Sequence, residues 1–365
     1  MKKAAAFFSL ALCGVLLVAA SELEILTQEF IAPPVEGHVH ASTLLPLTDG
    51  GYLAAWFEGT KEGAGDVAIK GSRRRNGRWE PVCVFAKVND DAPHWNPVLW
   101  RADDGRIVLF FKVGRNCSDW RTYVRESRDE GNSWTPPREL IAGEVRGGRG
   151  PVRNKCLRLA NGRWLAPASR EIGRWRAFVD ISDDDGRTWR ASPEFPVPAD
   201  APTKFGVIQP TLWADASGVH ALLRANDGWI WRTDSVDGGE TWRELYRSPL
   251  ENINSGIDCV RASDGKLYLV LNGADPNGKK KTWGSRSHLE LRSSSDGGKT
   301  WQTCCVLADD APRQPDGRGT EFSYPAIREP CPGVLAMTFT WNRRQIRFIE
   351  IRLPQARLRR RSLQE

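Results

Sequence analysis

Short runs of alternating apolar and polar residues recur along the chain, and tight turns join them in pairs. In six segments two such runs flank a turn that contains glycine: LLPLTDGGYLAAWF, VLWRADDGRIVLFF, CLRLANGRWLAPA, TLWADASGVHALL, CVRASDGKLYLVL and AIREPCPGVLAMTF. Asp-Gly and Asn-Gly between alternating runs are typical of β-hairpins, because these residues accept the positive φ of the turn. A third apolar run follows each hairpin, so the pattern predicts six copies of a three-stranded meander.

A second motif, S-x-D-x-G-x-T/S-W, follows the third strand in most copies. It is complete in SRDEGNSW (127–134), SDDDGRTW (182–189), SVDGGETW (235–242) and SSDGGKTW (294–301), and a degenerate copy is SRRRNGRW (72–79). A regular spacing of about 55 residues marks a repeat architecture. We expect a structural role for the motif, in which the serine and aspartate hydrogen-bond a turn and the tryptophan packs against the sheet.

Four-stranded sheets repeated around an axis make a β-propeller. The sixth copy has no S-x-D-x-G-x-T-W motif after its third strand, so residues 22–31 are expected to supply the fourth strand and close the ring. The sequence therefore predicts an all-β, six-bladed β-propeller with four-stranded antiparallel blades, formed by a single domain over residues 21–354.

The two ends of the chain differ from this pattern. Residues 1–20, MKKAAAFFSLALCGVLLVAA, combine two lysines, an apolar run and small residues, as in a secretory signal peptide. No later stretch approaches the roughly 18 apolar residues of a membrane helix. The sequence predicts an exported protein, periplasmic or secreted, with no membrane span and with a basic tail at residues 355–365.

The charge and the cysteines narrow the function only slightly. The formal net charge of +7 becomes +5 when the two lysines of residues 1–20 are removed. This mild excess suits an anionic substrate, and no clustered basic stripe indicates nucleic-acid binding. No zinc, calcium or phosphate-loop spacing is present, so neither a metal nor a cofactor is implied. The seven cysteines beyond residue 20 do not have the spacing of a disulfide framework, and nothing indicates the oligomeric state.

One face of the propeller is expected to carry the site. The start of each inner strand and the loop between the second and third strands of each blade reach the same face, where propeller channels bind ligands. All six inner strands open with a polar or ionisable residue: His40, Asn96, Lys155, Gln209, Asp258 and Tyr324. The loops above them add Asp66, Glu171, Arg224 and Arg286. Two of these residues have an alternative interpretation, since Lys155 could simply line the channel and Asp258 could cap a strand.

The repeated motifs, the six blades and these positions resemble the sialidase superfamily of BNR/Asp-box proteins over residues 25–352. The resemblance implies an acid/base role for Asp66 in GDVAIKGS and a nucleophilic role for Tyr324 in EFSYPAI. It also implies that Arg224 in ALLRAND and Arg286 in RSHLELRSSSDGGKTW bind the carboxylate of a sugar. Arginine suits this task because its guanidinium pairs with a carboxylate through two hydrogen bonds.

Two positions depart from the sialidase pattern. His40 stands where sialidases have the first arginine of a carboxylate-binding triad, so we expect it to line the site; His38 and His40 alone are too few for a zinc site. Gln209 stands where sialidases have a glutamate that helps to deprotonate the tyrosine. An amide cannot accept that proton, and the available substitutes are Glu321 and Glu171.

Three functions remain open on the sequence. The first is a sialidase-type exo-glycosidase that acts on an acidic terminal sugar of a glycan. The second is elimination on a uronic acid, with His40 and Tyr324 as the acid–base pair. The third is a propeller that binds glycans without cleaving them, with tryptophans near the channel mouth as stacking platforms.

Overall fold

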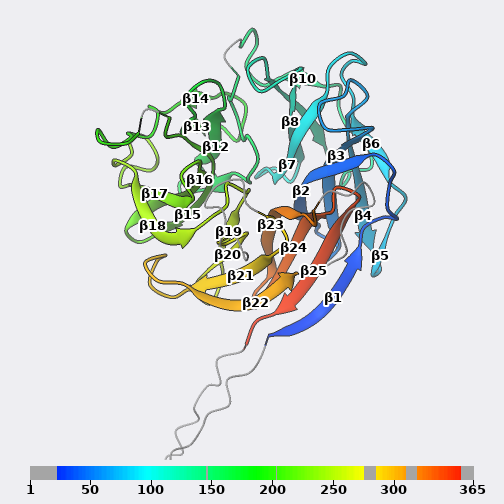
Figure 1. Ribbon diagram of the computed structural model, residues 1–365. Helices are drawn as coiled ribbons and strands as arrows, with labels where there is room; N and C mark the ends of the chain where they lie inside the picture. The colour runs from blue at the N-terminus through cyan, green and yellow to red at the C-terminus, as the bar shows by residue number, and fades with distance from the viewer. Residues whose placement is uncertain (1–22, 145–146, 203, 275–284, 310–318, 355–365) are drawn as a thin grey trace, which may run out of the picture.

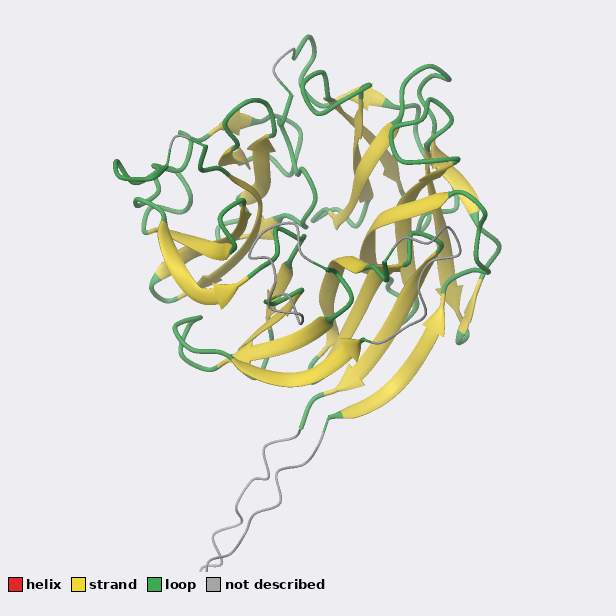
Figure 2. Cartoon of the chain, in the orientation of Figure 1, coloured by secondary structure: helices red, strands yellow, loops and turns green. Residues whose placement is uncertain are grey.

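The computed structural model describes residues 23–144, 147–202, 204–274, 285–309 and 319–354. Strands and the loops between them account for this part of the chain, and it contains no helix (Figure 2). The predicted signal peptide and the predicted basic tail lie outside the described residues.

The strands form six antiparallel sheets arranged around a common centre (Figure 1), which confirms the predicted six-bladed propeller. Blade one comprises β2 (His38–Pro46), β3 (Tyr52–Gly59), β4 (Ala68–Arg75), β5 (Arg78–Trp79) and β6 (Cys83–Ala86). Blade two comprises β7 (His94–Arg101), β8 (Ile107–Val113), β9 (Arg121–Ser127) and β10 (Arg138–Glu139). Blade three comprises β11 (Leu157–Arg158), β12 (Trp164–Arg170), β13 (Arg176–Ser182) and β14 (Arg190–Ala191).

The remaining blades are built in the same way. Blade four comprises β15 (Val207–Asp215), β16 (Gly218–Ala225), β17 (Trp229–Ser235) and β18 (Tyr246–Glu251). Blade five comprises β19 (Asp258–Arg261), β20 (Leu267–Leu271), β21 (Leu289–Ser294) and β22 (Gln302–Ala308). Blade six comprises β23 (Phe322–Cys331), β24 (Val334–Trp341), β25 (Gln345–Arg352) and β1 (Glu24–Phe30).

The first strand of the chain completes the last blade, as the sequence predicted. Strand β1 pairs antiparallel with β25, with Glu24 opposite Arg352 and Phe30 opposite Arg347. The two strands lie side by side at the rim of the ring (Figure 1). The ring is thus closed by backbone hydrogen bonds between the two ends of the chain.

The core lies between the blades. Each main cluster of buried apolar side chains joins two neighbouring sheets; one, for example, packs Phe57 of blade one against Leu109 and Phe111 of blade two. The alternation along each strand sends apolar side chains to both faces of a sheet that is covered on both sides. The interfaces between blades therefore hold the inner strands in fixed relative positions.

The S-x-D-x-G-x-T-W motifs form turns between the third and fourth strands. In SDDDGRTW, Asp184 accepts hydrogen bonds from the Ser182 hydroxyl at 2.8 Å and from the Thr188 amide at 2.8 Å. The Trp189 indole donates to the Gly186 carbonyl at 3.0 Å. These contacts are local and fit the structural role expected for the motif.

Blade three differs from the prediction of a regular inner strand in RNKCLR. Its inner strand pairs with the neighbouring strand only at Leu157 and Arg158. The preceding segment has positive φ at Gly147, Gly148 and Gly150, a conformation that glycine adopts without steric cost and that interrupts a strand. This irregular segment brings Arg149 and Arg153 into the interior.

Candidate functional site

Four inner strands contain a β-bulge near their first residues, at the end where the site is expected. Positive φ values occur at Ala41, Asn96, Gln209 and Tyr324, and the strand register shifts at each of these positions. In three of the four strands a proline follows, which lacks the N–H group that a bulge leaves unpaired. A β-bulge bends the strand and re-aims a side chain, so the repeated X-Pro step explains how Gln209 and Tyr324 leave the sheet pattern.

Tyr324 is the centre of the site, and three guanidinium groups surround it. Arg224 Nη1 donates a hydrogen bond to the Tyr324 hydroxyl at 3.0 Å. The guanidinium carbons of Arg153, Arg286 and Arg224 lie 4.9, 5.7 and 5.8 Å from the centroid of the Tyr324 ring. Arginines of blades three, four and five thus meet at a tyrosine of blade six, and burial lowers the pKa of Arg153 to about 10.

A chain of hydrogen bonds runs from Tyr324 to Glu171. Beyond its bond to the tyrosine, Arg224 Nη1 donates to Gln209 Oε1 at 3.3 Å, and Gln209 Nε2 donates to Glu171 Oε1 at 3.0 Å. Burial raises the pKa of the Glu171 carboxyl, although Arg224 opposes this shift. Within the described residues the Glu171 carboxylate accepts hydrogen bonds from Gln209 and Ser169, so it is linked to Tyr324 through Gln209 and Arg224.

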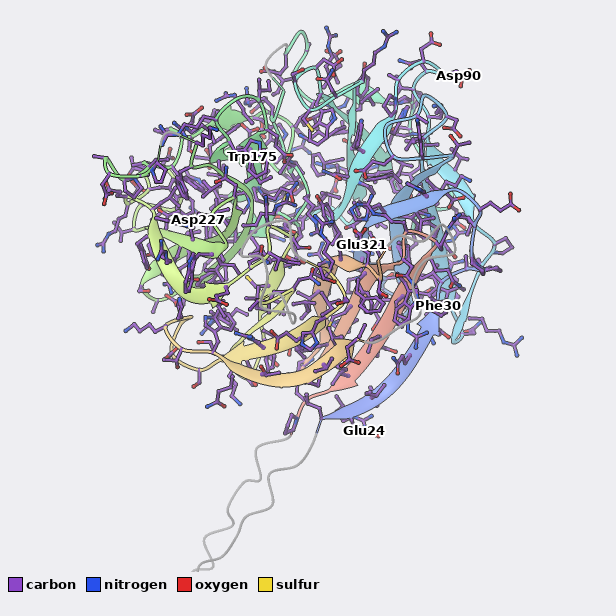
Figure 3. The ribbon with its side chains drawn as sticks, viewed as in Figure 1. Glu24, Phe30, Asp90, Trp175, Asp227 and Glu321 are labelled. Atoms are coloured by element: carbon purple, nitrogen blue, oxygen red, sulfur yellow. The ribbon has the colours of Figure 1, made fainter. Side chains whose placement is uncertain are left out.

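Glu321 is held between two arginines near the centre of the ring (Figure 3). Its two carboxylate oxygens accept hydrogen bonds from Arg286 Nη1 and Arg343 Nε, both at 3.0 Å, and the Ser323 hydroxyl donates at 2.6 Å. Burial alone would raise its pKa, but the charges of Arg343 and Arg286 prevail and hold the pKa at about 2. A carboxylate so paired is a poor proton acceptor for Tyr324 and is better suited to fixing the arginines.

His40 packs against Tyr324, with 4.1 Å between the ring centroids. Its Nδ1 lies 3.0 Å from the Thr340 hydroxyl, whereas its buried Nε2 has no hydrogen-bond partner among the described residues. Burial, followed by the charges of four arginines led by Arg343, lowers the pKa of His40 well below its ordinary value. The imidazole is therefore neutral at physiological pH and does not act as the cation that the resemblance would place there.

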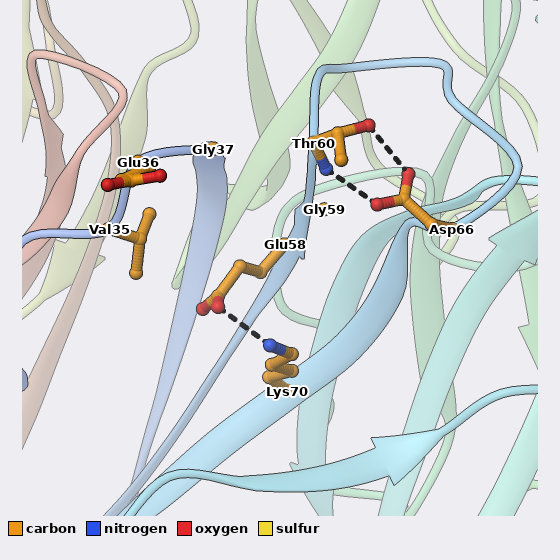
Figure 4. Close-up of a pocket in the computed structure, with 8 residues that line it drawn as sticks. All are labelled: Val35, Glu36, Gly37, Glu58, Gly59, Thr60, Asp66 and Lys70. Atoms are coloured by element: carbon orange, nitrogen blue, oxygen red, sulfur yellow. Dashed lines mark hydrogen bonds and ion pairs between the residues drawn. The ribbon is translucent and has the colours of Figure 1, made fainter.

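Asp66 lies on the loop between β3 and β4 and lines a pocket of about 380 Å³ at the rim of blade one (Figure 4). Its carboxylate accepts hydrogen bonds from the Thr60 amide at 2.8 Å and from the Thr60 hydroxyl at 3.0 Å. The same loop approaches Tyr324's surroundings through Glu62, which pairs with Arg343. Asp66 is thus exposed on a loop that contacts the site.

Lys155 and Asp258 pair with each other in the centre of the ring. The lysine ammonium lies 2.8 Å from both carboxylate oxygens, and Asp258 also accepts from the Thr211 hydroxyl at 2.8 Å and from the Ile327 amide at 3.0 Å. With these partners the carboxylate is fully occupied, which favours a structural role over substrate binding. Asn96 is also buried, at the bulge of blade two.

Three charged residues near the site were not identified from the sequence. Arg153 and Arg343 lie within segments expected at the mouth, but neither matches a sialidase position, and Lys155 was the residue selected in the segment that contains Arg153. Lys112, at the end of β8, is fully buried and donates to the Thr122 hydroxyl at 2.6 Å. Burial lowers its pKa to about 7.

The described residues contain no group of three or more metal-binding side chains and no helix long and apolar enough to cross a membrane. The seven cysteines within them are free.

Solved structures similar to this chain share its fold. A protein of unknown function from Dyadobacter fermentans DSM 18053 superposes with a TM-score of 0.72 at 17% identity, over 91% of this chain and 99% of that one. The Hadza microbial sialidase Hz136 gives a TM-score of 0.68 at 16% identity, over 87% of this chain and 66% of that one. The NanB sialidase of Streptococcus pneumoniae gives 0.66 at 13% identity, over 91% of this chain and 71% of that one.

At these identities the similarity shows the fold alone. No curated protein matches the chain. The model of the BNR repeat-like domain matches residues 50–334, which is most of the propeller. The chain belongs to the BNR repeat-like family and is a divergent member with structural similarity to sialidases.

Proposed function

We propose that the protein is an exo-glycosidase of the sialidase type that removes a terminal sugar bearing a carboxylate from a glycan. The observation that carries this proposal is the pair of guanidinium groups, Arg153 and Arg224, that face Tyr324 and have no carboxylate partner in the part of the chain that the structure describes. The hydrogen bonds of Arg224 within the described residues go to Asn254, Gln209 and Tyr324, and those of Arg153 go to Asn154 and the Pro325 carbonyl.

Buried cations without a paired anion are costly, and a bound anion repays that cost. Arg153 and Arg224 are each at most 4% exposed, so the unpaired charge lies in an environment of low dielectric. A carboxylate that enters this site gains charge-assisted hydrogen bonds that a neutral sugar does not gain. This favours an acidic sugar as the substrate.

In the proposed reaction Tyr324 first gives its phenol proton to solvent, and its oxygen then attacks the anomeric carbon. The bond to the leaving oxygen breaks as protonated Asp66 gives that oxygen its proton. Water then cleaves the bond between the sugar and the tyrosine, with the proton of the water passing to Asp66. Arg224 donates to the attacking oxygen and so stabilises negative charge on it. This contact supports the reaction although Gln209 cannot take the phenol proton.

A second candidate is β-elimination on a uronic acid, and one observation favours it. Burial keeps His40 neutral, and its ring packs on Tyr324. One of its ring nitrogens has no hydrogen-bond partner among the residues that the structure describes, as an acid–base pair for elimination requires. In that reaction one member of the pair removes the proton beside the carboxyl group, and the other protonates the leaving oxygen.

The test is to incubate the protein with sialylated glycans and, in parallel, with uronate polysaccharides. Release of free acidic sugar by the wild type, but not by Tyr324→Phe or Asp66→Asn, supports hydrolysis. Ultraviolet absorbance of an unsaturated uronate, lost in His40→Ala and retained in Asp66→Asn, supports elimination instead. Binding of either glycan with no product would refute both reactions and leave the glycan-binding function.

Export of the enzyme would give it access to extracellular glycans, and detection of the protein outside the cytoplasm tests this.

A further inference from the structure

Arg343 lies at the site on a turn whose backbone fixes its position. The turn joins β24 to β25, and both Asn342 and Arg343 have positive φ, at 51° and 57°. Residues other than glycine rarely adopt this backbone conformation, and those that do are often found at functional sites. At Arg343 this conformation directs the guanidinium at Glu321, where its charge also acts on His40.

The charges around Tyr324 do not balance. Three guanidinium groups surround Tyr324, those of Arg153, Arg224 and Arg286, and a fourth, that of Arg343, reaches the site through Glu321. Within the described residues, Arg286 and Arg343 are the two of these four that pair with carboxylates. The two partners are Glu321, which serves both arginines, and Glu62, which serves Arg343 alone. Direct pairing thus offsets two of the four positive charges.

Those two carboxylates differ in how firmly they are held. Glu321 makes three hydrogen bonds, and its side chain is 16% exposed. Glu62 lies on the loop that carries Asp66, its side chain is 38% exposed, and its ion pair is with Arg343. Water and a ligand can therefore reach the Glu62 carboxylate, whereas the Arg343 side chain is only 12% exposed, so Glu62 is the carboxylate that a ligand can replace.

His40 and Arg343 complement each other. The imidazole stands at the position where the sialidase resemblance expects an arginine, and it is packed on Tyr324 and bonded to Thr340, three residues before Arg343. A fifth cation at residue 40 would face the four guanidinium groups at close range. A neutral side chain in blade one is therefore compatible with an arginine supplied from blade six.

We propose that Arg343 joins Arg153 and Arg224 in binding the carboxylate of the acidic sugar, and that Glu62 occupies the Arg343 guanidinium until the substrate carboxylate replaces it. The inference rests on the proposed function, because it assigns a carboxylate-binding residue within the same site. It accounts for the missing arginine of blade one and makes Arg343 and Glu62 determinants of specificity for acidic over neutral sugars.

Binding measurements on two pairs of probes test the proposal. The probes are N-acetylneuraminic acid and glucuronic acid, each as the free acid and as the methyl ester, and dissociation constants are measured by calorimetry. Loss of a charge-assisted hydrogen bond weakens binding by about tenfold to a hundredfold. Arg343→Gln should weaken binding of the preferred acid by this factor and leave binding of its ester unchanged.

Glu62→Gln should act in the opposite direction. Removal of the competing carboxylate frees Arg343, so the acid should bind several-fold more tightly while the ester is unaffected. Substitution of a residue with a merely structural role would not strengthen binding of the acid. Glu62→Gln therefore still tests the proposal if Arg343→Gln does not fold. Arg352→Gln, which breaks the exposed pair with Glu24 at the rim, is the matched control and should bind as the wild type does.

The outcomes separate this inference from the function on which it rests. If the wild type binds an acid better than its ester but Arg343→Gln and Glu62→Gln behave like the wild type, the role of Arg343 is refuted and the proposed function stands. If the wild type binds neither acid in preference to its ester, both fall.

Discussion

Asp258→Asn should destabilise the protein severely, because the aspartate is the point at which four blades meet. Its carboxylate pairs with Lys155 of blade three and accepts from Thr211 of blade four and from the Ile327 amide of blade six. Its own strand belongs to blade five. The Lys155 and Asp258 side chains are 12% and 3% exposed, so neither charge is solvated.

The expected magnitude follows from what the substitution leaves behind. Asparagine keeps the size of the side chain but removes its charge, and Lys155 then remains charged and buried with a single amide oxygen in place of the carboxylate. Breaking one partner of a buried ion pair costs about 3–5 kcal/mol. With an unfolding entropy of about 2.1 cal/mol/K per residue over roughly 330 residues, this corresponds to a fall of about 4–7 °C in the midpoint temperature.

Differential scanning calorimetry on the wild type and three variants measures the effect. Asp103→Asn, which removes an exposed pair with Arg158, is the control and should lower the unfolding free energy by at most about 1 kcal/mol. The double variant Lys155→Met/Asp258→Leu should be less destabilised than Asp258→Asn alone, because no unpaired charge remains. An Asp258→Asn protein that melts within 1 °C of the wild type, by contrast with the fall of about 4–7 °C expected above, would refute the reasoning.

Three further predictions concern other residues of the site and its surroundings. A methyl group on Gly256 would lie 3.0 Å from Arg153 Nε and 3.3 Å from the Tyr324 ring, so Gly256→Ala should lower the turnover number. The added methyl group of Gly319→Ala meets no described atom within 4 Å, so this variant should keep the turnover number, and equal activity of the two variants would contradict the reasoning. The pKa of Glu321 is lowered from 4.5 to about 2, so its ionised form stabilises the fold above pH 4.5 and this contribution is lost as the pH falls toward 2. Unfolding measured across that range should therefore show a smaller pH dependence in Glu321→Gln, and an unchanged slope would argue against the pairing. The pKa of Lys112 is lowered from 10.5 to about 7, so the folded protein binds fewer protons than the unfolded chain between these values, and stability should rise with pH there in the wild type but not in Lys112→Met.

The architecture could be predicted from the sequence because it depends on local patterns. Turn residues between alternating runs define each hairpin, and the repeated motif fixes the length of each blade. Even the closure by residues 22–31 followed from counting strands, and β1 confirms it.

The site could be predicted only in part, because its composition depends on which side chains meet across blades. The sequence places Lys155 and Asp258 at the channel, but it does not reveal that they neutralise each other. Arg153 was not selected from the sequence, and the structure brings it to the Tyr324 ring from the irregular segment that precedes β11. Arg343 lies on a turn whose positive φ values are not evident from Asn-Arg-Arg.

The pairing of β1 with β25 has a consequence for how the molecule is made. Strand β1 is synthesised first, yet its partner is completed only about 320 residues later, and contacts so distant in sequence form slowly. During synthesis the edge of β1 stays open, and blade six cannot assemble until β25 has emerged. Ring closure is therefore a late event that follows translation. In a circular permutant that joins the two ends and opens the chain between two other blades, β1 and β25 would be neighbours in sequence. Blade six should then form early, and closure should fall to the newly opened pair of blades.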